Sequence, residues 1–487
     1  MQTFYNFLKW IDDNILWGIP MIVLMLLVGV LLTVRTKAVQ VRKFPTCIKG
    51  TIGKTLKPVK KDEKTKDKKT LSPFSAFCTA VSGTVGTGNI VGVTTAIISG
   101  GPGAVFWMWV SAFFGCVTKY AEIVLGVFYR KKDSKGEYIG GPMLYIEKGT
   151  KRKWLAILFA IFTMLAAIGY GSVQSDTIQK TWNSAFNIPT WVTALIVTAL
   201  TASVILGGLK RIGSVTTIIV PFMALSFIVF ALVLILANVT VVPAAFASIF
   251  TSAFSAKSAL GGFMGYGISQ AMRYGFARGI FSNEAGLGSS SIVHSTSDNR
   301  EPVEQGFWGV FEVFLDTFVI CTLTALFVLT SGIDGNTVSD GAIVSMQAFT
   351  GFFGKFGSVV YSVILPLFAF STILAWAVYG AKATQYLFKK HQKISKIIYD
   401  VVYLATIIII ALLTYFLGNN LSSDFVWLIS DMTNALMAIP NLIALFILSG
   451  KVVKITKNYF ARKKGEPLKP MISAYEDSPQ DDESEKN

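Results

Sequence analysis

The stretch "SGTVGTGNIVGV", Ser82–Val93, places four glycines and an asparagine inside a run that is otherwise apolar enough to cross a membrane. Glycine in a helix interior costs about 1 kcal/mol relative to alanine. An irregular backbone at membrane depth is tolerated only where it is buried in protein or lines a wet cavity. The stretch therefore indicates either a close crossing of two helices, which small residues also favour, or an unwound segment that binds a ligand.

The rest of the chain has the composition of a polytopic membrane protein. Of its 487 residues 52% are apolar and only 15% are charged, and several runs reach the length of about 18 to 20 residues that spans a bilayer. The first run is too long for a signal-peptide core and is expected to be a retained helix. The sequence predicts an all-α fold with eleven transmembrane helices, at residues 15–34, 74–99, 103–129, 154–182, 190–208, 213–237, 258–293, 305–330, 356–387, 397–417 and 422–449.

The charges of the connectors predict an orientation. The connector after the first span is rich in Lys and Arg, and so is every second connector after it, whereas the others are nearly uncharged. Basic connectors face the cytoplasm, so the N-terminus is expected outside and the C-terminus inside. The chain ends in an acidic segment, residues 473–487, which has the composition of a disordered cytoplasmic tail.

A second interruption, "FSNEAGLGSSS" from Phe281 to Ser291, lies five spans after the first. Because five is odd, the second set of five spans runs through the membrane in the opposite direction. Two such sets with broken first helices are typical of transporters built from inverted repeats, in which the breaks meet at the membrane midplane. The predicted organisation is an extra helix and basic connector (1–73), a first repeat (74–242), a second repeat (243–450) and a basic, then acidic tail (451–487).

Broken helices have a defined chemistry. The break frees backbone N–H groups at the start of one half-helix, which suit a carboxylate, and carbonyls at the end of the other, which suit Na⁺ or an ammonium group. A zwitterion such as an amino acid satisfies both kinds of group at once.

Five motifs together resemble the alanine or glycine:cation symporter family. They are "GTVGTGNIVGV", "GGPGAVFWMW" (Gly100–Trp109), "GGPMLYI" (Gly140–Ile146), "SNEAGLGSS" and "FSTILAW" (Phe370–Trp376), and the resemblance covers about residues 10 to 450. It implies ten core helices in a five-plus-five inverted repeat, as in neurotransmitter:sodium symporters, with one extra N-terminal helix. It also implies sodium-coupled import of alanine or glycine across a bacterial cell membrane, by a monomer in the lipid bilayer without a cofactor.

The resemblance to the sodium symporters implies a Na⁺ site. The carbonyls of Ser82 and Val85 would hold the ion together with groups on the eighth core helix. Phe368, Ser371 and Thr372 share one face of that helix and offer a carbonyl and two hydroxyls. Oxygen ligands without a carboxylate suit a hard monovalent cation. The alternative is that both hydroxyls only bond back to their own helix, as Ser and Thr often do.

The same resemblance implies substrate-binding groups. The break itself would face the substrate carboxylate, Phe281 and Asn283 would lie on the second broken helix, and Gln174 and Trp376 would close the pocket. The predicted substrate residues are Gly86, Thr87, Gly88, Asn89, Gln174, Phe281, Asn283 and Trp376. Trp376 has an alternative role as an anchor at the membrane interface, against which its depth in the span argues.

Charged residues inside spans are costly and point to function or to structural pairing. The candidates are Lys119, Glu122, Asp176, Glu284, Asp316 and Asp431. Lys119 and Glu122 are expected to pair locally because they are three residues apart on one helix, and Asp176 and Asp431 to lie near water at helix ends. Asp316 is the deepest by residue count. Either a coupling role or a polar bond to a neighbouring helix would explain it.

Other classes of function are disfavoured. The net charge of +16 comes from connectors between spans without interleaved aromatic residues, so it does not indicate nucleic-acid binding. Four scattered cysteines and two histidines do not build a metal cluster or a catalytic triad, and neither HExxH nor GxSxG is present. A channel is disfavoured because the sequence contains no selectivity-filter motif. The sequence thus predicts a sodium-coupled symporter, with a proton-coupled permease that uses Asp316 as the alternative.

Overall fold

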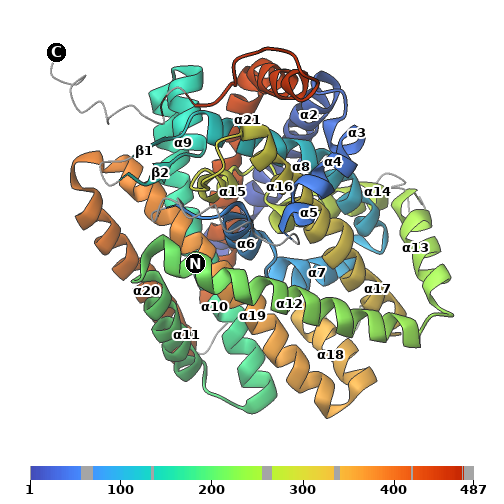
Figure 1. Cartoon of the computed structure of the whole chain (residues 1–487). Helices are drawn as coiled ribbons and strands as arrows, with labels where there is room; N and C mark the ends of the chain where they lie inside the picture. Colours follow the sequence, from blue (N-terminus) through green and yellow to red (C-terminus); the bar gives the residue numbers. More distant parts are fainter. Residues whose placement is uncertain are drawn as a thin grey trace.

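The computed structural model describes residues 2–55, 70–132, 136–254, 266–333, 341–417, 421–473 and 475. This part of the chain is almost wholly helical, as predicted, and its longest helices run side by side (Figure 1). The one strand pair is a short antiparallel hairpin of β1 (Lys131–Lys132) and β2 (Tyr138–Ile139).

The helices in chain order are α1 (Gln2–Ile11), η1 (Asp12–Leu16), α2 (Ile19–Arg35), α3 (Val39–Arg42), α4 (Phe44–Gly50), α5 (Ile52–Thr55), α6 (Pro73–Thr84), η2 (Thr87–Asn89), α7 (Val91–Gly100), α8 (Gly103–Phe128), α9 (Pro142–Leu144), η3 (Tyr145–Gly149), α10 (Lys153–Phe186), α11 (Thr190–Ile205), α12 (Gly208–Ala237) and α13 (Val242–Phe254). They continue with α14 (Tyr266–Asn283), α15 (Ser289–His294), α16 (Pro302–Val313), η5 (Phe314–Cys321), α17 (Thr322–Thr330), α18 (Gly341–Phe353), α19 (Lys355–Leu387), η6 (Lys389–His391), α20 (Gln392–Leu417) and α21 (Leu421–Lys463).

Membrane-spanning length and apolarity agree with the predicted class. Within the described residues, eight helices are long and apolar enough to cross a membrane, and the bent pair of α6 and α7 would make a ninth. The number eleven remains a prediction, since α11 is shorter and the predicted span 258–293 begins among residues 258–265, which lie outside the described part. Two further short apolar helices, α13 and α18, lie in segments where no span was predicted.

Both predicted interruptions are present. The first helix ends at Thr84, and the chain is extended at Gly86 before α7 resumes, with a bend of 60° across the break. The second helix ends at Asn283, and Glu284, Gly286 and Gly288 follow with positive φ values of 54°, 99° and 78°. Glycine reaches such values without steric cost, which explains its place in this break.

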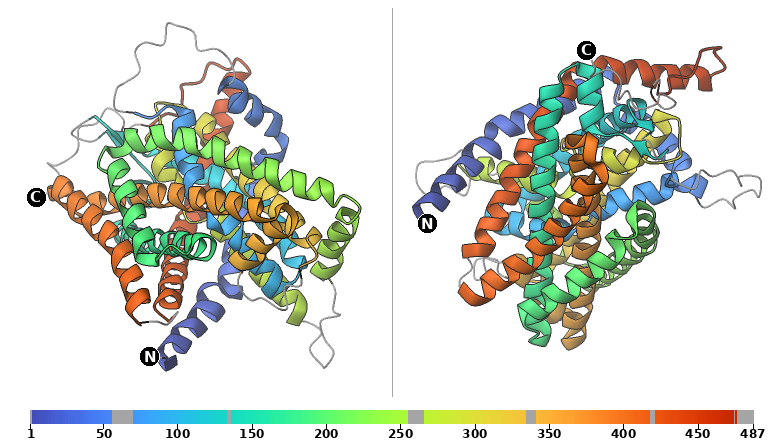
Figure 2. Two further views of the ribbon diagram at one scale, coloured as in Figure 1. Left: turned by 90° about the horizontal axis from the view of Figure 1, so that it is seen from below. Right: turned by 90° about the vertical axis from the view of Figure 1, so that its left-hand side faces the viewer.

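The helices around the breaks form the core of the molecule. The first broken helix α6 packs against α12, α15 and α19, and α8 packs against α14 and α16. The long helix α10 contacts α19 and α21. Figure 2 shows the helices from below and from the left-hand side of Figure 1. The extra helix α2 lies against α8 and α21 at the edge, where Gly29 approaches Phe114 so closely that a Cβ would lie 2.7 Å from the phenylalanine Cβ.

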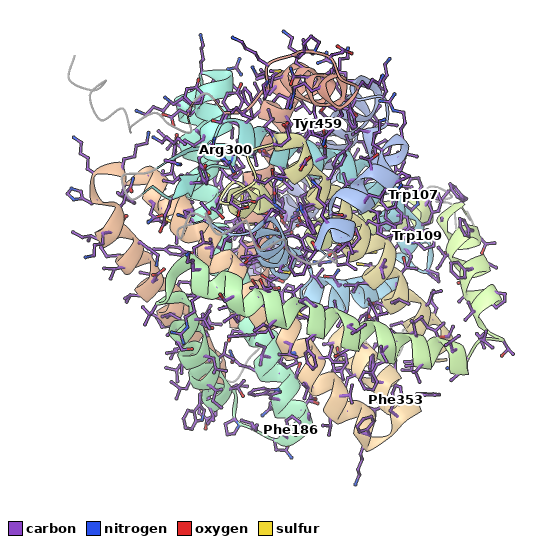
Figure 3. All side chains as sticks on the ribbon, in the orientation of Figure 1. Trp107, Trp109, Phe186, Arg300, Phe353 and Tyr459 are labelled. Carbon is purple, nitrogen blue, oxygen red and sulfur yellow. The ribbon has the colours of Figure 1, made fainter. Side chains whose placement is uncertain are left out.

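Residues expected on one side of the membrane gather at one end of the molecule. Arg300 and Tyr459, both predicted to be cytoplasmic, lie at one end, and Phe186 and Phe353, both predicted to be outside, lie at the other (Figure 3). The alternation of the predicted connectors therefore agrees with the fold. The identity of the cytoplasmic end still rests on the positive-inside rule.

A buried ionic network fixes the helix that follows the second break. Lys119 on α8 lies 3.2 Å from Glu312 of α16 and donates a hydrogen bond to Ser290 of α15 at 2.7 Å. His294 Nε2 lies 3.2 Å from the other oxygen of Glu312, and Lys119, Glu312 and His294 are fully buried. Charges that deep must be paired, so this network ties α15 to α8 and α16.

The predicted local pair of Lys119 and Glu122 is wrong. The Oε1 atom of Glu122 instead accepts hydrogen bonds from the backbone N–H of Gly286 at 2.9 Å and from Asn441 Nδ2 at 2.7 Å. The helix spacing permitted the local pair, but the unwound chain at Gly286 supplies a free N–H and α16 supplies a buried acid. Lys119 and Glu122 therefore bind partners from other parts of the chain and not each other.

Removing one member of the network should be destabilising. We expect Lys119→Met to lower the free energy of unfolding by about 3–5 kcal/mol, because it leaves the Glu312 carboxylate buried without its cation. The measurement is thermal unfolding of the purified protein in detergent. The double variant Lys119→Met/Glu312→Gln should recover most of the loss. Lys389→Met is the control, since Lys389 is 43% exposed and 3.4 Å from Glu147. Equal unfolding of Lys119→Met and wild type would contradict the assignment.

Candidate binding site at the two helix breaks

The first break faces α10 and α19 at close range. A Cβ added to Gly86 would lie 2.5 Å from Thr372 Oγ1 and 3.6 Å from Gln174 Nε2. One turn earlier, a Cβ on Gly83 would lie 2.8 Å from the hydroxyl of Tyr379. The glycines therefore bring the broken backbone against side chains of two other helices, and the structure joins three of the predicted site residues at one point: Gly86, Gln174 and Thr372.

The two breaks meet each other. A Cβ on Gly88 would lie 3.1 Å from the Phe281 ring and 3.7 Å from the Cα atom of Ser282, both near the end of α14. The glycine thus lets the chain just before α7 approach the end of α14 closely. The close contact and the unwinding are both observed, and ligand binding at the unwound segment stays a prediction.

Aromatic rings enclose this meeting point. The ring of Tyr170 stacks on Trp376, with 4.0 Å between centroids and 9° between planes, and on Phe281 at 4.9 Å. Trp376 is fully buried and donates from Nε1 to Glu284 Oε1 at 2.9 Å. Its ring is therefore enclosed by protein and bonded to the second break. The sequence reading missed Tyr170, although it precedes Gln174 by four residues and shares its helix face.

The two hydroxyl groups of α19 that are predicted to bind Na⁺ form hydrogen bonds within their own helix, as in the alternative interpretation. Ser371 Oγ and Thr372 Oγ1 both donate to the carbonyl of Phe368, at 2.9 and 3.0 Å. A hydroxyl that donates its proton keeps its acceptor lone pairs, so these bonds are compatible with ion binding. Across from α19, the carbonyls of Ser82 and Val85 accept no hydrogen bond from the described residues. Both lie next to the contact points at Gly83 and Gly86.

The carboxylate of Asp316 forms hydrogen bonds with residues of both breaks. The Oδ1 atom of Asn89 accepts from the N–H of Gly86 at 3.0 Å, and Asn89 Nδ2 donates to Asp316 Oδ1 at 2.6 Å. The other oxygen of Asp316 accepts from Ser282 at 2.8 Å and from Thr317 at 2.7 Å. Asp316 therefore holds the first break through Asn89 and the second through Ser282, and the predicted polar bond to neighbouring helices is confirmed.

Asn283 reaches Asp316 only through Thr317, whereas its neighbour Ser282 contacts Asp316 directly. The Nδ2 atom of Asn283 donates to Thr317 Oγ1 at 3.2 Å, and its Oδ1 atom accepts from the N–H of Ala285 at 3.0 Å. Its amide thus shapes the second break without facing the first. A shift of one residue turns a side chain by about 100° around a helix, so sequence alone did not distinguish the two positions.

Several polar groups at the meeting point lack a partner among the described residues. The hydroxyl of Thr87 and the side-chain carbonyl of Gln174 are buried without a hydrogen bond. The backbone N–H groups of Thr87 and Gly88 likewise donate to none of these residues. A buried polar group without a partner costs about 1–3 kcal/mol, so these groups, on the first break and on Gln174 beside it, point to a polar ligand.

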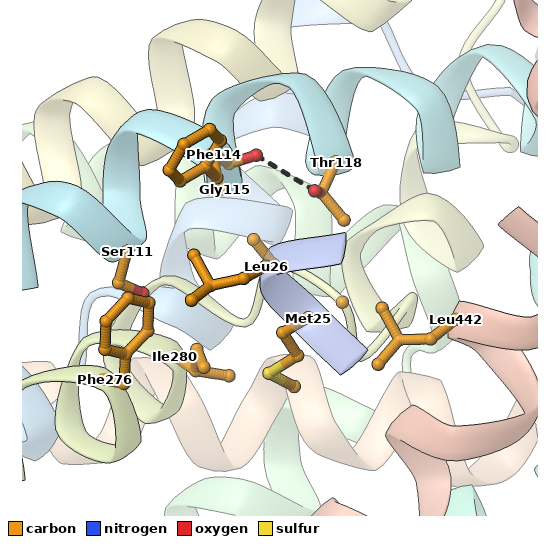
Figure 4. Close-up of a pocket in the computed structure, with 11 residues that line it drawn as sticks. Met25, Leu26, Ser111, Phe114, Gly115, Thr118, Phe276, Ile280 and Leu442 are labelled. Atoms are coloured by element: carbon orange, nitrogen blue, oxygen red, sulfur yellow. Dashed lines mark hydrogen bonds between the residues drawn. The ribbon is translucent and has the colours of Figure 1, made fainter. Parts of the chain in front are cut away.

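A small crevice, lined mostly by apolar side chains, lies beside Ala285 and Gly286 of the second break. It measures about 20 Å³ and is lined by Met25 and Leu26 of α2, Phe276 and Ile280 of α14, and Leu442 of α21 (Figure 4). Thr118 also lines the crevice and donates to the carbonyl of Phe114 at 2.9 Å. This crevice has room for about one water molecule. The candidate substrate site is therefore not this crevice but the group of polar atoms between the breaks.

An ion pair lies beside the Phe281 ring, near the end of α14. Arg278 lies over the Phe281 ring, 5.6 Å from its centroid, and 3.7 Å from Asp431 of α21. Asp431 and Asp176 were expected near water. The side chains of Asp176 and Asp431 are only 7% and 16% exposed, and both acids lie well inside α10 and α21, so their expected position at helix ends is wrong. Their partners Lys180 and Arg278 are more exposed, at 44% and 22%.

Comparisons with known proteins agree on one family. The sequence model of the family described as the sodium:alanine symporter family matches residues 1–474. The chain is 39% identical to the sodium/alanine symporter AgcS of Methanococcus maripaludis, over 93% of this chain and 97% of that protein. It is 43% identical to an uncharacterized transporter of Haemophilus influenzae, over 93% and 95%. Among solved structures, MhsT in complex with L-phenylalanine superposes with a TM-score of 0.58 at 13% identity, over 80% of this chain and 99% of that one.

Proposed function

This chain belongs to the sodium:alanine symporter family, and from that membership we propose that it imports alanine or glycine together with Na⁺. As a member it is a multi-pass membrane transporter and not an enzyme, and its helical core has the fold of MhsT. The identity of the amino acid and the coupling ion are the parts proposed here.

The unpartnered groups between the two breaks support an amino-acid substrate. The free N–H groups of Thr87 and Gly88 suit a carboxylate at the start of a half-helix. The unpartnered carbonyl oxygen of Gln174 suits an ammonium group. A zwitterion would supply both charges, and the main-chain groups that bind it do not depend on the substrate side chain.

The packing around these groups supports a small side chain. A Cβ on Gly88 would press against Phe281, and a Cβ on Gly86 would press against Thr372, so even a methyl group would require a shift. The stacked rings of Tyr170 and Trp376 bound the site on another side. Alanine and glycine add the least volume next to these rings. A larger substrate would have to part the Tyr170–Trp376 stack.

The oxygen groups between α6 and α19 support Na⁺ as the coupling ion. Two carbonyls of the first break and two hydroxyls and a carbonyl of α19 would surround the ion. Because these ligands belong to two elements, the bound ion would hold them together and favour substrate binding at Gly86. Occupancy of both sites would then permit the broken helices to rock toward the cytoplasm.

Uptake into proteoliposomes tests the proposal. Labelled alanine is supplied under an inward Na⁺ gradient, an equal K⁺ gradient, or a proton gradient alone, with glycine and larger amino acids as unlabelled competitors. We expect accumulation only with Na⁺, and competition by glycine but not by large side chains. Accumulation driven by protons alone would contradict sodium coupling and transfer the coupling role to Asp316, whose fully buried carboxylate is the observation that favours that alternative.

A further inference from the structure

A cavity lined by cations lies where α2 and α21 end. Its volume is about 260 Å³. We call it the basic pocket, after the six cations that line it: Arg35, Lys37, Arg42, Lys43, Lys457 and Lys464. Glu466 is the one carboxylate among its described lining residues, and Val453, Thr456, Phe460 and Ala461 form its wall on α21.

The cations of the basic pocket lack carboxylate partners. None of the six forms an ion pair with an acid of the described residues; Arg35 donates to Ser449 Oγ at 2.5 Å, and Lys43 lies 4.7 Å from the centre of the Phe460 ring. Two lysines at the start of α20 and just before it differ, because Lys389 pairs with Glu147 and Lys396 with Asp400. The positive-inside rule explains the presence of basic residues, but it does not require them to line one cavity without counter-charges.

The backbone of the connecting turn is held in an unusual conformation. Lys37 and Ala38 have φ values of 56° and 50°, which side chains other than glycine rarely adopt. The turn leads α3 back beside the end of α2, so Arg35 and Arg42 line the same cavity. Strained turns persist where their surroundings hold them, and they gather at binding sites.

The exposed face of α2 leads to this cavity. Its exposed apolar residues are spaced three or four apart, as one stripe of a helix is, and they are Ile19, Val23, Leu27, Val30 and Val34. Arg35 follows directly at the helix end. An amphiphile with acyl chains along the stripe would bring an anionic headgroup to Arg35 and its neighbours.

We propose that the basic pocket binds the phosphodiester headgroup of an anionic phospholipid from the cytoplasmic leaflet. Arginine and lysine clusters beside a transmembrane helix attract such headgroups, and the guanidinium of Arg42 can hold two phosphate oxygens at once. Free inorganic phosphate shares the headgroup chemistry but leaves the apolar stripe of α2 unused. The bound lipid fixes α2 against the end of α21.

Lipid titration of the full-length protein in detergent tests the proposal without any transport assay. Binding of short-chain phosphatidylglycerol is followed by native mass spectrometry, with phosphatidylcholine and inorganic phosphate in parallel. We expect saturable binding of phosphatidylglycerol only. Arg42→Gln/Lys457→Gln should weaken it about 30-fold, because each lost cation near the membrane surface accounts for several-fold in affinity. Lys390→Gln/Lys393→Gln on the other basic connector should leave it unchanged.

The other outcomes overturn the proposal. Equal affinity of the Arg42/Lys457 variant and wild type would place the lipid elsewhere, and equal binding of phosphatidylcholine would remove the role of charge. Saturation by inorganic phosphate at the same concentration would show an anion site without a lipid. Binding that begins only when residues 476–487 are removed would assign the pocket to the acidic end of the chain itself. Both variants retain the candidate substrate site, so a failure of the proposed transport function would not affect these results.

Discussion

Thr372→Val is expected to raise the Na⁺ concentration for half-maximal uptake by about tenfold or more. The substitution keeps the branched shape but removes the hydroxyl that faces Gly86, and a polar contact to a charged group contributes about 1.5–3 kcal/mol. The change should appear in the sodium dependence of alanine uptake, with a smaller effect on the maximal rate at saturating Na⁺. Thr372→Ser retains the hydroxyl and should stay close to wild type.

A threonine further along the same helix provides the matched control. Thr384 Oγ1 donates to the carbonyl of Gly380 at 2.8 Å, the same type of bond that Thr372 makes to Phe368, but three turns away from the breaks. Thr384→Val should leave the sodium dependence unchanged. If Thr372→Val behaves like Thr384→Val, the hydroxyl serves only its own helix and the proposed ion site is incorrect.

Local backbone chemistry made the breaks predictable from sequence. Clusters of glycine with asparagine are unusual within membrane helices, and the structure has a break at both such stretches, residues 82–93 and 281–291. Isolated glycines such as Gly29 of α2 and Gly115 of α8 leave their helices unbroken. The short helices α13 and α18 escaped prediction for the opposite reason, since their apolar runs are below the length of a span. Length and composition identify helices that cross a membrane, but they do not identify short helices that cover a core.

Tertiary contacts determined what the sequence could not. Lys119 and Glu122 have the spacing of a helix pair, yet each finds a partner on another element. Tyr170 and Ser282 carry no sequence signal of their own, because aromatic and hydroxyl side chains are common in membrane helices. Their importance arises from what lies opposite them, Trp376 for the tyrosine and Asp316 for the serine. Such partners come from helices far apart in the sequence.

Asp316 is expected to be essential for substrate binding as a fixed acceptor between the breaks. In Asp316→Ala the amide of Asn89 and the hydroxyls of Ser282 and Thr317 lose their acceptor. Each buried donor left unpaired costs about 1–3 kcal/mol, so the affinity for alanine should fall about 100-fold or more. Asp316→Asn keeps one acceptor oxygen and should lose less. Equilibrium binding of labelled alanine in the presence of Na⁺ measures both.

The neutral variant also separates a structural carboxylate from a proton carrier. If Asp316 only holds the breaks, Asp316→Asn weakens binding equally in acidic and alkaline buffer, and uptake remains dependent on Na⁺. A carboxylate that carries the coupling proton predicts a different result, because Asp316→Asn would then bind and exchange alanine but no longer accumulate it under a proton gradient. Asp400→Asn, whose acid pairs with Lys396 on α20, controls for the loss of a carboxylate elsewhere. Since Asp316 contacts both breaks at once, the first result would mean that one side chain transmits the position of each broken helix to the other.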